Sequence, residues 1–446
     1  MNFEESVRYL LSLGRELAAP TQASAAKFNL ENINILNEAL GRPDRGYPSA
    51  HIAGTNGKGS TAAFLESILR HAGFKTGLYT SPHLERINER LRVNGDEISN
   101  AAFAETLTRL QATIEALLRD EKLRAHPTFF ECVTAMAFEY FRDVGVTFGV
   151  FEVGLGGRLD ATNILLPKVS VITRIDFDHE NFLGHSLREI AGEKAGIIKP
   201  DVPVVVAEQS DEALLVIEER ARKQGSVVTR VDEAYETTQL HFEDGCVRAH
   251  VTERSTGKSF RIAPLLPGRF QLQNALNALA AARRLATEHI HISDQAIVEG
   301  IATAQWPGRL EKLHAHPDIY LDGAHNPAAA RELADFIEHN LRGRTIYMLF
   351  GALRDKAVDE VAGILFPNAG EVVFTEARTS RAISAAELAR IAGYHTEAFS
   401  VETSAEDALE RLMAKAGHDD VIFVTGSLYL VGQIRHYWRK RAKVAR

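Results

Sequence analysis

The sequence is poor in the features that mark secreted and membrane proteins. Its 446 residues include two cysteines, Cys132 and Cys246, which are too few for a disulfide framework and lack a metal-ligand spacing. No run approaches the roughly 20 apolar residues that a membrane helix needs. The segment from Met1 to Glu5 has no positive stretch and no apolar core, so it does not resemble a signal peptide. We therefore expect a cytoplasmic protein in a reducing compartment, without a membrane partner.

An excess of positive charge is also missing. The chain has 51 lysine and arginine residues against 59 aspartate and glutamate residues, a formal net charge of −8. Binding nucleic acid through global charge requires a basic surface, so we expect no nucleic-acid partner. Hydrophobic residues make up 45% and charged residues 25% of the chain, a balance typical of globular proteins and not of disordered ones. The length predicts about two or three domains.

Short β-branched segments alternate with amphipathic helical segments along most of the chain. This alternation predicts an α/β fold with a mostly parallel sheet. The polar segment 226–263 contains the hairpin signals Asp244-Gly245 and Thr256-Gly257, which predict a small antiparallel patch. A second α/β series follows Trp306, so we expect a larger domain, 1–306, and a smaller one, 307–446. The expected strands are 49–53, 76–80, 146–153, 169–175, 202–207, 318–322, 345–350, 371–375 and 420–425, and the expected helices include 60–72, 129–142 and 269–286.

A glycine-rich segment between an expected strand and an expected helix is the strongest local motif. It reads Gly54-Thr55-Asn56-Gly57-Lys58-Gly59-Ser60. Glycines let backbone N–H groups converge on phosphate oxygens, the helix N-terminus adds positive potential, and a lysine reaches the terminal phosphates. The standard spacing G-x-x-x-x-G-K-[ST] is not met, because Ile52 replaces the first glycine and Gly59 follows the lysine. A plain glycine-rich turn is the alternative, but the strand–loop–helix context indicates a nucleotide site.

Polar residues follow three further expected strands. Ser81, Glu152 and His179 supply a hydroxyl, a carboxylate and an imidazole. Open α/β sheets place their ligands at the carboxyl ends of strands, and Mg²⁺ prefers oxygen ligands but tolerates an imidazole. The spacing is therefore compatible with a magnesium site, although a histidine such as His179, taken alone, is more often an ordinary polar residue.

The segment 54–60, in its Lys-Gly-Ser form, resembles the ATP loop of the folylpolyglutamate synthase and dihydrofolate synthase family of the Mur ligase superfamily. Further matching motifs occur in the family's order, and the resemblance covers about residues 5–435. These motifs are 80–84, 151–163, 176–179, 192–200, 307–311 and 320–327. The resemblance implies a Mur-ligase-like P-loop ATPase domain with a mostly parallel sheet, followed by a smaller Rossmann-like α/β domain.

The resemblance also implies roles for residues of the first domain. ATP would bind along 54–60, with Lys58 acting in catalysis, and Mg²⁺ would be held by Ser81, Glu152 and His179. Lys194, which read alone is an ordinary helix lysine, would be carbamylated by CO₂. Carbamylation requires the neutral amine, so a lowered pKa is expected there.

Other implied roles lie near and beyond the domain boundary. Asn274 would lie near the adenine, Arg309 would reach the nucleotide phosphates and Asp322 would contact the ribose. His325 would lie near the reacting centre, and Ser427 would belong to the pocket for the incoming glutamate. Polarity at a helix N-terminus is an equally simple explanation of Asn274.

The chemistry that the resemblance implies is ATP-dependent amide formation. The acceptor carboxylate attacks the γ-phosphate of ATP to give an acyl phosphate, whose carbonyl is then attacked by the amine of L-glutamate. The cell-wall ligases of the superfamily carry a uridine-nucleotide domain before the ATP loop. Here the loop begins by residue 54, which favours the folate branch.

Segments 127–131 and 159–163 resemble the bacterial bifunctional enzymes, in which Phe130 and Asp160 would lie near the pterin and aminobenzoyl groups. We therefore expect a monomer that adds glutamate to tetrahydrofolate polyglutamates and to dihydropteroate. A synthase for tetrahydrofolates alone, a ligase for another amino acid and a nucleotide hydrolase without an acceptor site remain alternatives. Arg378 and Arg381 either assist an acidic substrate or are solvated loop residues.

Overall fold

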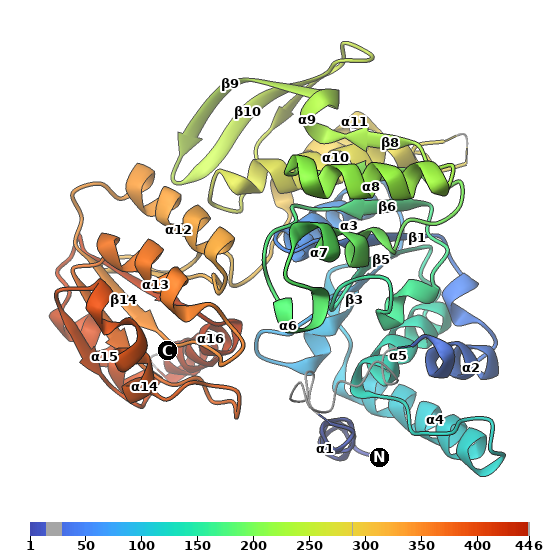
Figure 1. Cartoon of the computed structure of the whole chain (residues 1–446), viewed down its shortest axis with the longest axis horizontal. Helices are drawn as coiled ribbons and strands as arrows, with labels where there is room; N and C mark the ends of the chain where they lie inside the picture. Colours follow the sequence, from blue (N-terminus) through green and yellow to red (C-terminus); the bar gives the residue numbers. More distant parts are fainter. Residues whose placement is uncertain (15–28, 288, 445–446) are drawn as a thin grey trace.

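Two α/β units lie side by side in the computed structural model, which describes residues 1–14, 29–287 and 289–444 (Figure 1). The first unit is built on an eight-stranded sheet, called here the first sheet. Its strand order is β4 (Asp96–Glu97), β3 (Leu91–Val93), β2 (Thr76–Tyr79), β5 (Phe148–Glu152), β1 (Ser49–Ala53), β6 (Val169–Ile172), β7 (Val204–Val206) and β8 (Val228–Arg230). The six strands from β2 to β8 in this order run parallel, and β3 and β4 add an antiparallel edge.

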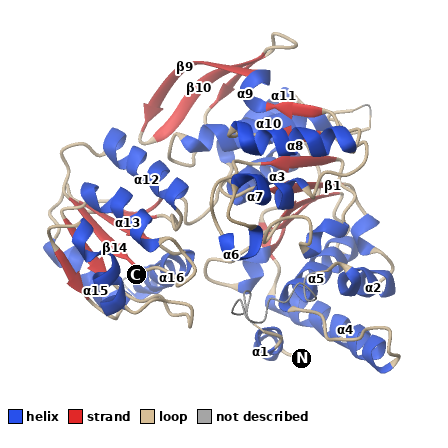
Figure 2. Ribbon diagram, viewed as in Figure 1, coloured by secondary structure: helices blue, strands red, loops and turns tan. Residues whose placement is uncertain are grey.

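Helices cover both faces of the first sheet, which is why its central strands are buried along their whole length and mostly apolar (Figure 2). One face packs against α3 (Lys58–His71), α10 (Phe270–Leu285) and α11 (Asp294–Thr303). The other face packs against α2 (Glu31–Ala39), α4 (Asn100–Arg119), α5 (Phe129–Asp143), α7 (Leu187–Ala195) and α8 (Asp211–Lys223). Helix α1 (Phe3–Ser12) and the four-residue helices α6 (Glu180–Leu183) and α9 (Val231–Ala234) also belong to this unit. Helix α3 begins two residues before the expected position, because Gly57 caps it in the left-handed conformation.

The predicted antiparallel patch is a separate three-stranded sheet of β9 (Tyr235–Glu243), β10 (Cys246–Glu253) and β11 (Ser259–Ile262). Both predicted hairpin signals lie at its turns. The predicted segment, 226–263, begins too early in the sequence. It includes β8, which pairs in parallel with β7 and completes the first sheet. The β9–β10 hairpin reaches over α12 (Pro327–Asn340), where a Cβ at Gly245 would lie 2.9 Å from the Phe336 ring (Figure 1).

The second unit is built on a six-stranded sheet, called here the second sheet. Its strand order is β12 (Glu311–His314), β13 (Asp318–Leu321), β17 (Val421–Thr425), β14 (Ile346–Phe350), β15 (Glu371–Phe374) and β16 (Phe399–Val401). All neighbours are parallel except β12 and β13. One face is covered by α12, α13 (Val358–Leu365) and α14 (Ala385–Ala392), and the other by α15 (Ala405–Lys415) and α16 (Leu428–Val444).

The fold is α/β with a mostly parallel first sheet, an antiparallel patch and a second parallel-sheet unit, as predicted. Both cysteines are free, and Cys132 is fully buried in α5. Among the helices in the described part of the chain, none is both long and apolar enough to cross a membrane.

Candidate active site

The glycine-rich loop leaves β1 and enters α3 with its backbone pressed against neighbouring side chains. Gly54 has φ +151°, and a Cβ there would lie 1.8 Å from Thr173 Oγ1. Gly57 has φ +85°, and a Cβ there would lie 2.2 Å from Asn274 Oδ1. Only glycine combines this conformation with this close approach. Lys58 Nζ folds back and donates to the carbonyls of Gly54 and Thr55, both at 3.0 Å.

One cavity between the two units collects the residues that the sequence predicted for the nucleotide, the metal and catalysis. The cavity lies where the carboxyl ends of β1, β2, β5 and β6 face the second unit, in agreement with the rule for ligand sites in open sheets. Its lining contains all of those residues: Gly54, Thr55, Asn56, Gly57, Lys58, Gly59, Ser60, Ser81, Glu152, His179, Lys194, Asn274, Arg309, Asp322 and His325. We call it the nucleotide cavity.

The three predicted metal ligands have a donor chemistry that fits Mg²⁺. The Ser81 N–H donates to Glu152 Oε2 at 3.1 Å, which fixes the carboxylate beside the Ser81 hydroxyl. Burial raises the pKa of Glu152, and the nearby Lys58 ammonium opposes that shift. Burial and the positive charge of Lys356 lower the pKa of His179 to about 3, so its imidazole is neutral. His179 Nδ1 is buried and has no hydrogen-bond partner in the described part of the chain, as a metal-binding nitrogen would.

Lys194 lies near the end of α7, beneath the glycine-rich loop. Its side chain is buried, and Nζ donates to the Gly54 carbonyl at 2.8 Å. Burial, followed by the charge of Lys58, lowers the pKa of Lys194 from 10.5 to about 7. A large fraction of this amine is therefore neutral near physiological pH, which is the form that the expected carbamylation requires.

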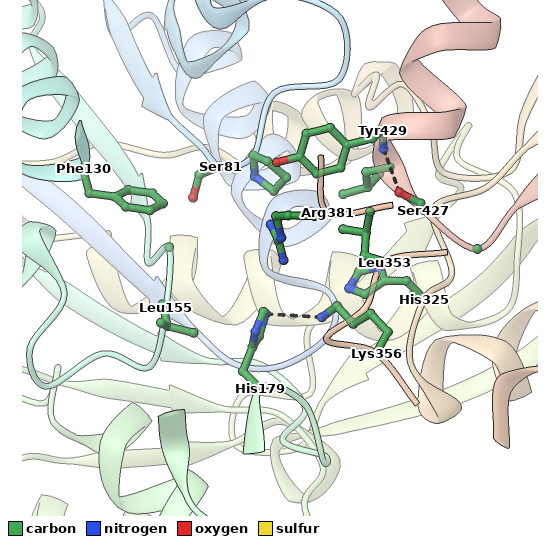
Figure 3. A pocket seen from close by; sticks show the side chains of 14 residues that line it. Ser81, Phe130, Leu155, His179, His325, Leu353, Lys356, Arg381, Ser427 and Tyr429 are labelled. Carbon is green, nitrogen blue, oxygen red and sulfur yellow. Dashed lines mark hydrogen bonds between the residues drawn. The ribbon is translucent and has the colours of Figure 1, made fainter. Parts of the chain in front are cut away.

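A second cavity adjoins the nucleotide cavity, and Figure 3 shows it from close by. We call it the acceptor cavity. Phe130 and Leu155 line it from the first unit, and Arg381, Ser427 and Tyr429 line it from the second. The two cavities share seven lining residues: Ser81, Pro82, Gly154, Leu155, His179, His325 and Leu428.

The two arginines considered for an acidic substrate have different positions. Arg381 lies in the acceptor cavity, where one terminal nitrogen contacts both carboxylate oxygens of Asp355 at 2.7 Å. Arg378 is largely exposed and pairs with Glu406 at 2.9 Å. Only Arg381 is therefore placed to meet a molecule in the cavity.

Asp160 does not line either cavity. Its Oδ2 accepts hydrogen bonds from the N–H groups of Gly154 and Leu155, and its Oδ1 accepts one from the Thr162 N–H, all at 3.0 Å. Burial raises its pKa, and these hydrogen bonds oppose the shift. A Cβ at Gly154 would lie 3.2–3.3 Å from Phe130, Ser81 and Asp160. In this structure, Asp160 thus shapes the loop that faces both cavities.

Three further residues join the two units beside these cavities, with Asp178 lining the nucleotide cavity and Lys356 the acceptor cavity, and the sequence analysis gave none of them a role in the site. Lys356 Nζ contacts Asp178 Oδ1 at 2.6 Å. Asn326 Nδ2 donates to Asn56 Oδ1 at 3.0 Å and to Asp178 Oδ2 at 3.3 Å. Burial would raise the pKa of Asp178, but hydrogen bonding from His325 and the Lys356 charge hold it well below its usual range. Asp178 and Lys356 follow the ends of β6 and β14, a position that could have marked them as candidates.

Family comparisons match both units. The Mur ligase middle domain matches residues 52–282, and the Mur ligase glutamate ligase domain matches residues 308–428. The dihydrofolate synthase/folylpolyglutamate synthase of Bacillus subtilis is 38% identical over 421 residues, covering 92% of this chain and 94% of that protein. The chain belongs to the folylpolyglutamate synthase/dihydrofolate synthase family of Mur ligases.

Solved structures of this family share the fold over nearly the whole chain. Mycobacterium tuberculosis folylpolyglutamate synthase complexed with ADP has a TM-score of 0.88 and 31% identity, covering 98% of each chain. Escherichia coli FolC in complex with DHPP and ADP has a TM-score of 0.86 and 29% identity, covering 99% of each chain. The resemblance found in the sequence is therefore confirmed at the level of the family and its fold.

Proposed function

We propose that this member of the family ligates L-glutamate to folates at the expense of ATP. The observation that carries the proposal is the junction of the nucleotide and acceptor cavities at Ser81, His179 and His325. An acceptor carboxylate in one cavity can meet a γ-phosphate in the other only at such a junction. The names of the relatives and the ADP and DHPP of the Escherichia coli complex support the same chemistry. We assign ATP binding to residues 1–306 and glutamate ligation to 307–446.

The first step is attack of the acceptor carboxylate oxygen on the γ-phosphate, which yields an acyl phosphate and ADP. Ser81, Glu152 and His179 would hold Mg²⁺, which supplies charge neutralisation for the phosphates. Lys58 and Arg309 line the same cavity and add positive charge where the transferred phosphate gathers negative charge. The backbone N–H groups of the glycine-rich loop orient the phosphates.

The second step is attack of the glutamate amine on the acyl carbonyl, with phosphate as the leaving group. His325 is positioned to act at this centre, because it lines both cavities and its Nδ1–H donates to the Gly323 carbonyl at 2.7 Å, which orients the ring. Ser427 and Arg381 face the acceptor cavity from the second unit. We assign them to the carboxylates of the incoming glutamate. Closure of the two units holds amine and carbonyl together.

Lys194 is proposed to act as a carbamate. The ammonium first loses one proton, and the neutral amine then attacks CO₂, forms an N–C bond and releases a second proton, so a cation becomes an anion. Burial of Lys194 and its pKa of about 7 support this modification. The new carboxylate would lie next to the phosphate loop, where it could bind a second divalent ion.

Two acceptors are proposed, dihydropteroate and tetrahydrofolate with its polyglutamates. Phe130 supports binding of a flat aromatic group, because its ring lines the acceptor cavity. Asp160 would act by positioning Gly154 and Leu155 beneath that group. The enzyme is proposed to work in the cytoplasm as a monomer, and size-exclusion chromatography tests its oligomeric state. A synthase restricted to tetrahydrofolates is the competing proposal.

An isotope experiment tests the acyl-phosphate route. Dihydropteroate carrying ¹⁸O in its carboxylate is incubated with ATP, Mg²⁺ and L-glutamate, and the released phosphate is analysed by mass spectrometry. The attacking oxygen stays with phosphorus when the amine displaces phosphate, so each turnover should place one ¹⁸O in phosphate. Product formed without transfer of the label would contradict the route.

A further inference from the structure

Two histidines and an aspartate gather at the end of the second sheet that is opposite the active site. His316 lies in the turn between β12 and β13, and His418 and Asp419 lie in the loop between α15 and β17. Because β13 and β17 are neighbouring parallel strands, the residues that precede them come side by side. Asp322 and Ser427 follow the same two strands at the other end. The cluster is therefore separate from both cavities.

The three side chains offer ligand atoms to a common point. The His316 and His418 rings are stacked, with centroids 3.9 Å apart and planes 16° apart. His418 Nδ1 and Asp419 Oδ1 are 2.9 Å apart. One ligand atom from each residue lies within 4.8 Å of the others. Ligand atoms of a tetrahedral zinc site are about 3.4 Å apart, so rotation of these exposed side chains brings them to bonding positions.

The backbone of both loops is fixed by contacts outside the cluster. Arg344 donates from Nε to the Asp419 carbonyl at 2.5 Å and from Nη1 to Asp318 Oδ2 at 2.7 Å, so one side chain joins the loop before β17 to the first residue of β13. His316 has φ +68°, a left-handed conformation that is uncommon for residues other than glycine. The cluster is thus held on anchored segments, and only its side chains need to move to bind an ion.

We propose that His316, His418 and Asp419 form a binding site for a divalent transition-metal ion such as Zn²⁺. Two imidazoles and one carboxylate suit zinc, nickel or copper better than magnesium, which prefers oxygen ligands. All three residues are exposed, so water completes the coordination. The bound ion joins the β12–β13 turn to the loop before β17, and it takes no part in the ligase reaction.

A metal titration of the full chain tests this site. The protein is stripped with a chelator and saturated with Mg²⁺ and ADP, so that the active site is filled, and Zn²⁺ is titrated by calorimetry. The test variants are His316→Asn, which tolerates the left-handed backbone, and His418→Ala. His339→Ala is the matched control, because His339 is also exposed and lies 3.2 Å from a carboxylate oxygen of Asp335, and among the described residues it belongs to no such three-residue cluster.

The expected result is one Zn²⁺ site in the wild type and in His339→Ala, with affinity reduced at least about 10-fold in both test variants. Electron paramagnetic resonance of bound Cu²⁺ should show two nitrogen ligands in the wild type and one in His418→Ala. Ligase activity should be the same in all four proteins. A wild type without the site, test variants that bind like the wild type, or a control that loses binding would each overturn the proposal.

Discussion

Replacing Lys194 with methionine should stabilise the fold and abolish activity. Keeping a lysine protonated when its pKa falls from 10.5 to about 7 costs about 5 kcal/mol of unfolding free energy below pH 7. Methionine has a similar length and no charge, so the substitution removes this cost. It also removes one of the two donors to the Gly54 carbonyl, the other being Lys58 Nζ, and a hydrogen bond from a charged group contributes about 1–3 kcal/mol. The expected net gain is about 2–4 kcal/mol near pH 6.5.

The gain from Lys194→Met should depend on pH in a defined direction. The unfolded chain titrates this lysine near pH 10.5 and the folded chain near pH 7, so the unfolded state binds more protons between these values. The cost of burying the lysine is therefore full below pH 7 and disappears as the pH rises toward 10.5. The difference in stability between variant and wild type should fall to near zero at about pH 9.5.

Urea unfolding at both pH values, in CO₂-free buffer so that no carbamate forms, measures this difference. Lys199→Met is the matched control, since Lys199 lies on the same segment, donates to the Asn163 carbonyl at 2.7 Å and has a pKa lowered by burial to about 8. Lys199 lines neither of the two cavities, so this variant should keep its activity. A Lys194→Met protein destabilised equally at both pH values would refute the reasoning.

Three further substitutions address the two cavities separately. Phe130→Ala removes an aromatic face of the acceptor cavity and should raise the KM for dihydropteroate about 10- to 100-fold, from about 1.5–3 kcal/mol of lost apolar contact. Lys58→Met should lower kcat at least about 100-fold, because it removes a charge from the phosphate site. Gly57→Ala should raise the KM for ATP, because its Cβ would collide with Asn274 Oδ1. Steady-state kinetics with each substrate varied in turn measure all three.

Each of these predictions is tested by comparing the effects of the substitution on the KM for each substrate, on turnover and on the folded state. Phe130→Ala should leave the KM for ATP unchanged, and an equal rise for both substrates would mean that the ring only supports the fold. Lys58→Met should remain folded while losing turnover. Gly57→Ala with an unchanged KM for ATP would contradict the placement of the nucleotide on this loop.

Local chemistry explains why much of the fold was predictable. Gly57 needs a left-handed backbone at the start of α3, and the Asp244-Gly245 turn needs positive φ values, so these residues mark their positions in the sequence. The apolar strands of both sheets were found for a similar reason, because burial on two faces removes polar residues from them. Strand β8 was assigned to the antiparallel patch because its polar sequence reflects its place at the edge of the first sheet.

The site contacts that the sequence analysis missed depend on tertiary structure. The pairing of Lys356 with Asp178 joins residues 178 positions apart, and no local pattern predicts it. Asn326 was recognisable as a helix cap, and it does accept from the Ala329 N–H, but its amide also reaches Asn56 across the cavity. The placement of Asp160 near the acceptor stays a prediction, and the sequence did not indicate that its oxygens accept hydrogen bonds from the surrounding loop. The first two cases depend on how the two units meet, and the third depends on the fold of the loop after β5.

The most direct test of the proposed function is the mass of the products formed from each acceptor. Purified protein is incubated with ATP, Mg²⁺ and L-glutamate, with dihydropteroate or tetrahydrofolate offered separately, and the products are weighed by mass spectrometry. The account predicts that both acceptors gain a glutamyl residue, with one ATP consumed for each addition. Turnover of ATP without a mass gain on either acceptor would contradict it, and a gain on tetrahydrofolate alone would remove dihydropteroate from the assignment.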